Sequence, residues 1–74
     1  MKFQENDFVE IKTLFSNPVF NGGRGHVKVG LFTQRNERIS YTQYLVDFEY
    51  SPFDFNDSQF WFFEEELKKV EKSS

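Results

Sequence analysis

The chain of 74 residues contains no cysteine and no alanine, and it has only one histidine and two prolines. Without cysteine it can form no disulfide and offers no thiolate, and a single histidine, His26, makes a metal site built on these residue types implausible. No apolar run approaches the roughly 20 residues of a membrane-spanning helix, and the first residues do not follow the pattern of a signal peptide. We therefore expect a cytoplasmic protein without membrane association, cofactor or metal ion.

Aromatic residues are abundant, with eleven phenylalanines, three tyrosines and one tryptophan. Aromatic residues favour strands, whereas alanine, the best helix former, is absent. The composition therefore predicts an all-β fold. A chain of this length forms a single domain, 1–74, with an ordered core at about 7–70 and a frayed tail at 71–74. Because each buried ring hides roughly 150–250 Å² of surface, we expect about ten rings to be needed in so small a core.

The pattern of apolar residues and turn formers predicts five short strands. They are placed at 8–13, 26–33, 39–50, 60–63 and 68–70, with a glycine-containing loop at 14–25 and one helical turn at 64–67; a terminal helix over 64–72 is the alternative for the last part. In the second strand, strict alternation puts Val27, Val29 and Leu31 on one face. In the third strand the apolar positions change phase, which predicts a kink or β-bulge near Thr42 or Gln43.

The order of these elements resembles the SH3-like barrel, including its KOW and Tudor groups. The matching segments are Asp-Phe-Val-Glu-Ile-Lys at 7–12, Gly-Gly-Arg-Gly-His-Val-Lys-Val at 22–29, Tyr-Leu-Val-Asp-Phe at 44–48 and Phe-Phe-Glu-Glu-Glu-Leu at 62–67. The resemblance implies a five-stranded barrel with one 3-10 turn before the last strand, similar in size to small SH3-like proteins of phages and prophages. The chain lacks the Ala-Leu-Tyr-Asp-Tyr start and the Trp-Trp pair of signalling SH3 domains, and it has fewer bases near its glycines than a KOW domain. These departures weaken both proline-rich peptides and RNA as expected ligands.

Charge is unevenly distributed along the chain. Residues 1–46 carry six Lys or Arg and four Asp or Glu, whereas residues 47–66 carry seven acids and no base. Such a balance argues against binding through nucleic-acid phosphates and allows a surface for a basic partner. We therefore predict a non-enzymatic module, a monomer or weak homodimer, that binds a protein through aromatic and acidic residues: Tyr41, Asp47, Phe53, Asp54, Phe55, Asp57, Trp61 and Glu64.

The same charges support two alternative functions. In the first, the more basic half of the chain binds nucleic acid in the manner of a KOW-like barrel, through Lys12, Arg24, Lys28, Arg35 and Arg38. In the second, the acidic segment 47–66 mimics DNA and inhibits a DNA-binding enzyme.

Three motifs could carry chemistry, and each has a simpler structural explanation. The glycine-rich segment 21–25 could hold an anion, but a turn accounts for every glycine. Residues 54–65 partly match a calcium loop, but Gln59 stands where the glycine is required. The adjacent acids Glu64, Glu65 and Glu66 could act as an acid–base pair, but neighbouring acids usually point apart into solvent. We therefore predict neither a catalytic nor a metal site.

Overall fold

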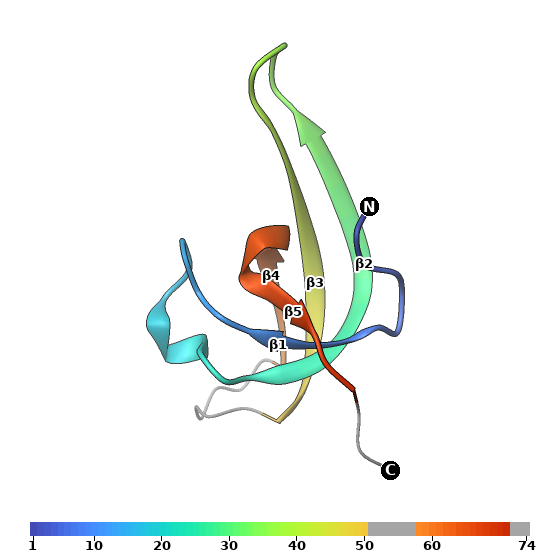
Figure 1. Ribbon diagram of the computed structural model, residues 1–74, viewed down its shortest axis with the longest axis vertical. Coiled ribbons are helices and arrows are strands. Elements are labelled where there is room, and N and C mark those ends of the chain that lie inside the picture. Colours follow the sequence, from blue (N-terminus) through green and yellow to red (C-terminus); the bar gives the residue numbers. More distant parts are fainter. Residues whose placement is uncertain (51–57, 72–74) are drawn as a thin grey trace.

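The computed structural model describes residues 1–50 and 58–71, and this part of the chain forms one antiparallel sheet of five strands (Figure 1). The strands are β1 (Phe8–Ile11), β2 (Arg24–Gln34), β3 (Ser40–Tyr50), β4 (Gln59–Phe63) and β5 (Leu67–Lys69), with the 3-10 turns η1 (Pro18–Phe20) and η2 (Glu64–Glu66). The predicted all-β class and the single turn before the last strand are confirmed. The alternative of a terminal helix over 64–72 is wrong, because residues 67–69 pair with β1. In the described residues no helix is long and apolar enough to cross a membrane.

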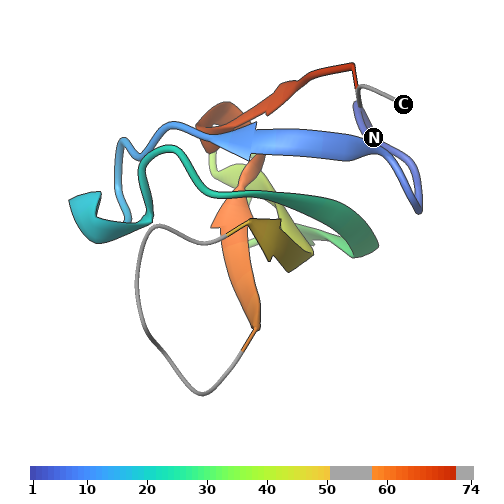
Figure 2. The same ribbon diagram turned by 90° about the horizontal axis from the view of Figure 1, so that it is seen from below.

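The sheet follows the order β4-β3-β2-β1-β5 and curls around its core. Figure 2 shows β1 and β5 lying across one side of the molecule, with β3 and β4 on the other. Strands β2 and β3 form a long hairpin whose outer half, residues 31–42, projects beyond the body and is called the arm here (Figure 1). The arm accounts for the elongated shape, which measures 41 × 25 × 18 Å.

The core is built from aliphatic and aromatic side chains in similar measure. Its fully buried members are Phe3, Val9, Ile11, Val27, Tyr44, Val46, Phe62 and Leu67, and three half-buried rings pack against them, those of Phe20, Phe48 and Phe60. Six rings of the described residues therefore serve the core, fewer than the expected ten. The β-branched residues from β1, β2 and β3 fill the centre, so that other rings are left for the surface.

Strand β2 contains a β-bulge at Lys28. Val27 pairs with Val46, but the next paired residue is Val29, which stands opposite Leu45. The extra residue reverses the alternation, because a shift of one position sends every following side chain to the other face. Val27 is therefore buried, whereas Val29 is 48% exposed. The prediction that these two residues and Leu31 share one face is wrong.

Strand β3 has no bulge of its own at the predicted position. Its pairing with β2 runs without a shift through Thr42 and Gln43. The apolar residues change phase because both faces of β3 carry them: Tyr44 is buried, and Leu45 next to it points to the opposite side. The predicted kink is therefore wrong. The change of phase arises because β3 carries apolar side chains on both of its faces.

The glycine-containing segment 21–25 is a turn that leads into β2. Gly22 has a φ of 84°, a conformation that residues with a Cβ rarely adopt, and its N–H donates to the carbonyl of Ile11 at 3.0 Å. At Gly25 a Cβ would overlap the carbonyl oxygen of Asp47, so β2 and β3 could not approach each other here with any other residue. The turn and the close approach explain these glycines.

Candidate binding surface on the outer sheet face

The side of β2, β3 and β4 that faces away from the core carries a continuous group of apolar side chains. The register places most of them in two cross-strand rows, Val29–Leu45–Trp61 and Leu31–Gln43–Phe63. Side chains alternate along a strand, so both rows lie opposite the core residues Tyr44 and Phe62. We call this surface the outer face and define its apolar residues as Val29, Leu31, Tyr41, Leu45, Trp61 and Phe63.

Ring contacts extend the outer face at the base of the arm. The ring of Phe63 meets that of Tyr41 at 5.6 Å between centroids and that of Phe15 at 5.3 Å, both nearly edge to face. Aromatic pairs prefer this geometry, which stabilises them beyond simple area burial. Phe15 comes from the loop after β1, so a segment distant in the sequence completes the surface.

The outer face is open to solvent over much of its area. Leu31 is 51% exposed and Trp61 is 45% exposed, although both are large and apolar. Contiguous apolar patches of appreciable size are rare on monomeric proteins and mark interaction sites. Trp and Tyr are also enriched where proteins meet. The chemistry of this surface suits contact with another macromolecule.

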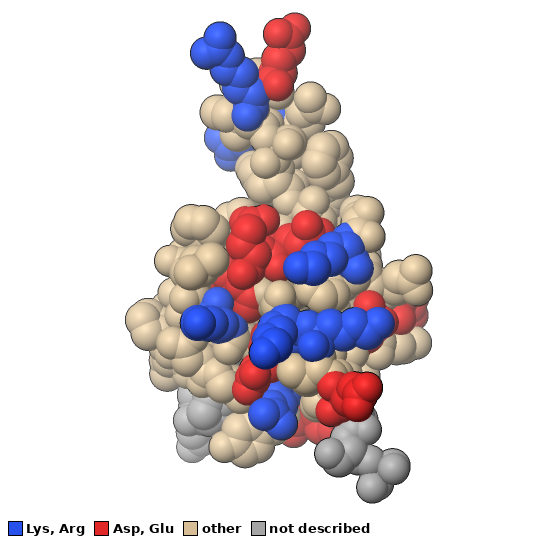
Figure 3. Space-filling model, viewed as in Figure 1, with Lys and Arg blue, Asp and Glu red and all other residues tan. Residues whose placement is uncertain are grey.

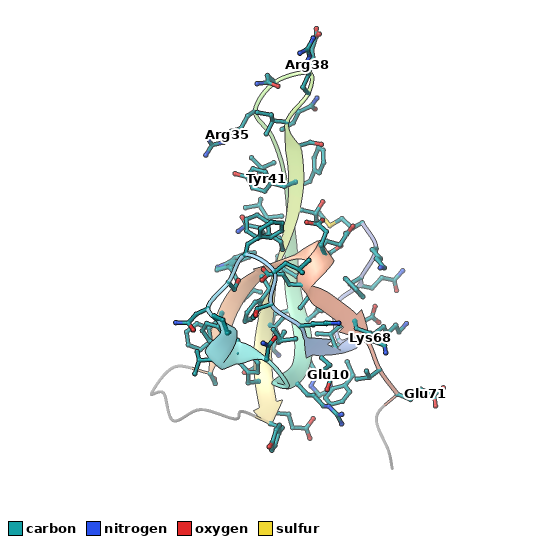
Figure 4. All side chains as sticks on the ribbon, turned by 60° about the vertical axis from the view of Figure 1, so that its left-hand side comes forward. Glu10, Arg35, Arg38, Tyr41, Lys68 and Glu71 are labelled. Carbon is teal, nitrogen blue, oxygen red and sulfur yellow. The ribbon has the colours of Figure 1, made fainter. Side chains whose placement is uncertain are left out.

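Charged groups stand at both ends of the outer face. Near the body Asp47 lies 4.0 Å from Lys28, and Glu49 lies 3.9 Å from Nδ1 of His26. At the tip of the arm the charged residues are Arg35, Glu37 and Arg38. Figure 4 shows Arg35 and Tyr41 on the same side of the arm, as strand alternation requires. The apolar centre is therefore bounded by charge.

The structure brings together some of the predicted partner-binding residues. Tyr41 and Trp61 both belong to the outer face, and Asp47 lies at its end. Glu64 does not, because its carboxylate accepts a hydrogen bond from the core hydroxyl of Tyr44 at 2.7 Å. The remaining predicted residues lie outside the described part of the chain: Phe53, Asp54, Phe55 and Asp57.

The predicted nucleic-acid-binding residues do not form one basic surface. Arg24 pairs with Glu10 at 3.2 Å, Lys28 lies near Asp47, and Lys12 follows β1. Figure 3 shows basic side chains on the body and at the end of the arm, with uncharged side chains between them. Arg35 and Arg38 occupy the arm and are thereby separated from the other three.

A second group of bases surrounds Glu10 on the β1 side of the sheet. Glu10 stands opposite Arg24 in β2 and opposite Lys68 in β5. Lys68 and Glu10 lie near each other in Figure 4. The sequence does not predict that Lys68 lies beside Glu10, because the pairing of β1 with the last strand is known only from the fold.

Glu66 is a buried carboxylate that organises the loop after β1. It is fully buried, and its Oε2 accepts from the backbone N–H groups of Leu14, Phe15 and Ser16 at 3.0, 3.1 and 2.9 Å. Its Oε1 accepts from the Ser16 hydroxyl at 2.9 Å and from the N–H of Phe63 at 3.1 Å. These bonds hold Phe15 and Phe63 in the positions where their rings meet.

The environment of Glu66 favours its charged form. Burial by itself would raise the pKa of this carboxyl, but the N–H groups of Ser16, Leu14 and Phe63 stabilise the carboxylate more strongly and lower the pKa below its ordinary value. The three adjacent acids do point in different directions, but the expectation that all are solvated is wrong for Glu66. Three of the N–H donors, at residues 14–16, lie about fifty residues away in the sequence, so no local pattern indicates this role.

Tyr44 links the core to the start of the chain. Its hydroxyl donates to Oε2 of Glu64 at 2.7 Å and accepts from the N–H of Phe3 at 3.1 Å. Burial raises the pKa of the Tyr44 phenol above its ordinary value, and the neighbouring Glu64 carboxylate raises it further. The hydroxyl therefore stays protonated and serves as a structural donor.

The described residues contain no group of three or more His, Asp or Glu side chains placed to hold a metal ion. Residues 54–57, the first four of the segment that partly matches a calcium loop, lie outside the described residues. The sequence matches no family model, and neither a curated protein nor a solved structure is similar enough to show a relationship. We therefore infer function from the chemistry of the surface.

Proposed function

We propose that the chain is a non-enzymatic, SH3-like domain that binds a protein through its outer face. The observation that carries this proposal is the row Val29–Leu45–Trp61, an apolar stripe across three strands whose two end residues are exposed and whose middle residue is half-buried. The core does not need these side chains, because its own set lies on the opposite side of the same strands. An apolar centre that includes Trp, with charged ends, is the usual composition of a protein–protein contact.

Two of the three adjacent acids have structural contacts. Glu66 is buried, and Oε2 of the half-buried Glu64 accepts a hydrogen bond from Tyr44. Asp47 and Glu49 supply the acidic groups at the end of the outer face, each beside a basic side chain. Electrostatic complementarity at this end would govern the association rate and the choice of partner, and the apolar rows would provide affinity.

The test replaces Trp61 and a matched aromatic residue outside the outer face. Trp61→Ser removes the β4 end of the stripe, whereas Phe32→Ser removes a ring that is 54% exposed on the opposite side of the arm. Proteins captured from a bacterial lysate by the unaltered chain should also be recovered by Phe32→Ser and lost by Trp61→Ser. Circular dichroism confirms that both variants are folded. Undiminished recovery by a folded Trp61→Ser chain would refute the proposal.

The shape and charge of the arm support nucleic acid as a second candidate partner. It is a two-stranded ribbon that carries Arg35 and Arg38 at its tip, and the major groove of DNA admits such a ribbon. Binding of duplex DNA that weakens steeply with salt, and that is lost in the double variant Arg35→Ala/Arg38→Ala, would support this function. The unaltered chain's failure to bind duplex DNA at low salt would eliminate it.

A further inference from the structure

The strand register gives the outer face a defined centre. The two apolar rows lie at the levels of Gln43 and Leu45, so the midpoint between them is at the level of Tyr44. Counting along the chain, Ile39 lies five residues before Tyr44, and Glu49 lies five residues after it. The two ends of the face are therefore the same number of residues away from its centre.

Opposite charges stand at these two levels. The N–H of Arg35 donates to the carbonyl of Ile39 at 2.9 Å, so Arg35 is level with Ile39. Its side chain lies on the same side of the arm as Tyr41 (Figure 4). Glu49 is the extra residue of β3 at the register shift between Arg24 and Gly25, and its carboxylate lies 3.9 Å from Nδ1 of His26 at this end of the outer face. One end of the face thus presents a guanidinium and the other a carboxylate.

We propose that the outer face binds the outer face of a second copy of this chain. This inference rests on the proposed function, because it names the partner of the same surface. A two-fold axis at the level of Tyr44, between the two sheets and perpendicular to the strands, places the apolar rows of one copy on those of the other. Sheets that pack in this way lie about 10 Å apart.

The charges select the antiparallel arrangement of the two copies. A two-fold axis perpendicular to the strands reverses the strand direction of the second copy, so Arg35 of each copy comes to the level of Glu49 in the other. The symmetry generates this contact twice. Parallel strands would instead set the arginine ends against each other and the carboxylate ends against each other, and like charges in an interface are costly. The outer face is therefore complementary to itself in the antiparallel arrangement, which a two-fold axis closes into a dimer.

Two neighbouring residues of the arm provide a matched test. Leu31 and Phe32 are 51% and 54% exposed, but alternation places Leu31 on the outer face and Phe32 on the opposite side. Sedimentation equilibrium should give the unaltered chain and Phe32→Ser about twice the mass of 8.9 kDa that one chain has. Leu31→Ser should raise the dimer dissociation constant by at least about tenfold, because each dimer loses two buried side chains. A monomeric unaltered chain at millimolar concentration, or equal effects of the two variants, would overturn the inference.

Charge exchange tests the orientation of the two copies. Arg35→Glu should weaken the dimer, and adding Glu49→Arg in the same chain should restore it, because the two charges exchange places in both contacts. The difference in dimer dissociation constant between the single and the double variant should decrease at high salt. If the double variant is no tighter than Arg35→Glu alone, the antiparallel arrangement is wrong.

The two proposals fail in different ways. A chain that remains monomeric but loses captured proteins with Trp61→Ser has a partner of another kind, so the proposed function stands and the inference falls. A chain that dimerises through a surface insensitive to both Trp61→Ser and Leu31→Ser also refutes the inference, and the capture experiment then decides the proposed function by itself.

Discussion

Both carboxylate oxygens of Glu66 bind Ser16. Oε2 accepts from the Ser16 N–H at 2.9 Å, and Oε1 accepts from its hydroxyl at 2.9 Å. A buried charge is tolerated only when donors replace its lost water, and this loop supplies them. The contact fixes the loop after β1 against the end of β4, and with it one border of the outer face.

Removal of the Glu66 carboxylate should destabilise the fold strongly. Glu66→Ala leaves four partly buried backbone N–H groups without their acceptor, at a cost of about 3 kcal/mol or more. Urea unfolding measures the loss, and Glu65→Ala is the control, because this adjacent side chain is exposed. Equal stability of the two variants would show that the loop does not depend on Glu66.

Stability should fall when the solution is acidified. The folded protein lowers the pKa of Glu66, so the stabilisation is fully present above the ordinary value of 4.5 and is lost as the pH falls through the folded pKa. Urea unfolding from neutral to acidic pH should show this decline. In Glu66→Gln, which cannot ionise, the free energy of unfolding should depend less on pH over the same range. An unchanged dependence on pH would show that Glu66 does not cause the decline.

Ionisation of Tyr44 should lower the stability of the fold at alkaline pH. Its raised pKa means that the stabilisation is present below the ordinary value of 10.0 and is lost as the pH rises through the folded pKa. Tyr44→Phe removes this loss and, at neutral pH, costs roughly 1 kcal/mol through the missing hydrogen bonds. Thermal unfolding at neutral and alkaline pH tests both effects, and a Tyr44→Phe profile that follows the unaltered chain would exclude them.

The close approach of β2 and β3 makes Gly25 sensitive to substitution. In Gly25→Ala the new methyl group overlaps the carbonyl oxygen of Asp47, which is backbone and cannot move aside freely. We expect a loss of roughly 2 kcal/mol or more in the free energy of unfolding. Ser40→Ala, an exposed change at the start of β3, should be nearly neutral in the same assay.

The strands could be predicted because apolar residues and turn formers alternate clearly along the chain. The turn at 64–66 and the short strand after it were also predictable, since acids followed by an isolated leucine give too short a pattern for a helix. The bulge at Lys28 was not, because a register shift depends on how β2 meets β3. The acceptor role of Glu66 depends on a loop about fifty residues away, which no local pattern reveals.

The candidate surface was only partly predictable for a related reason. Tyr41 and Trp61 could be singled out because rings near loops often meet ligands. Val29 and Leu31 could not, because an apolar residue that alternates along a strand indicates the core as readily as an exposed face. Only the bulge decides between the two, and it places both side chains outside.

The presence of the extra residue in β2 therefore matters more than the type of its side chain. Lys28 could be exchanged for many side chains without disturbing which valine points inward. Deleting it would put every later position of β2 out of step, hide Val29 and Leu31, and force Gly30 and Phe32 outward. Substitutions in β2 therefore change the chemistry of the outer face one residue at a time, whereas a single insertion or deletion exchanges the side chains of its two faces.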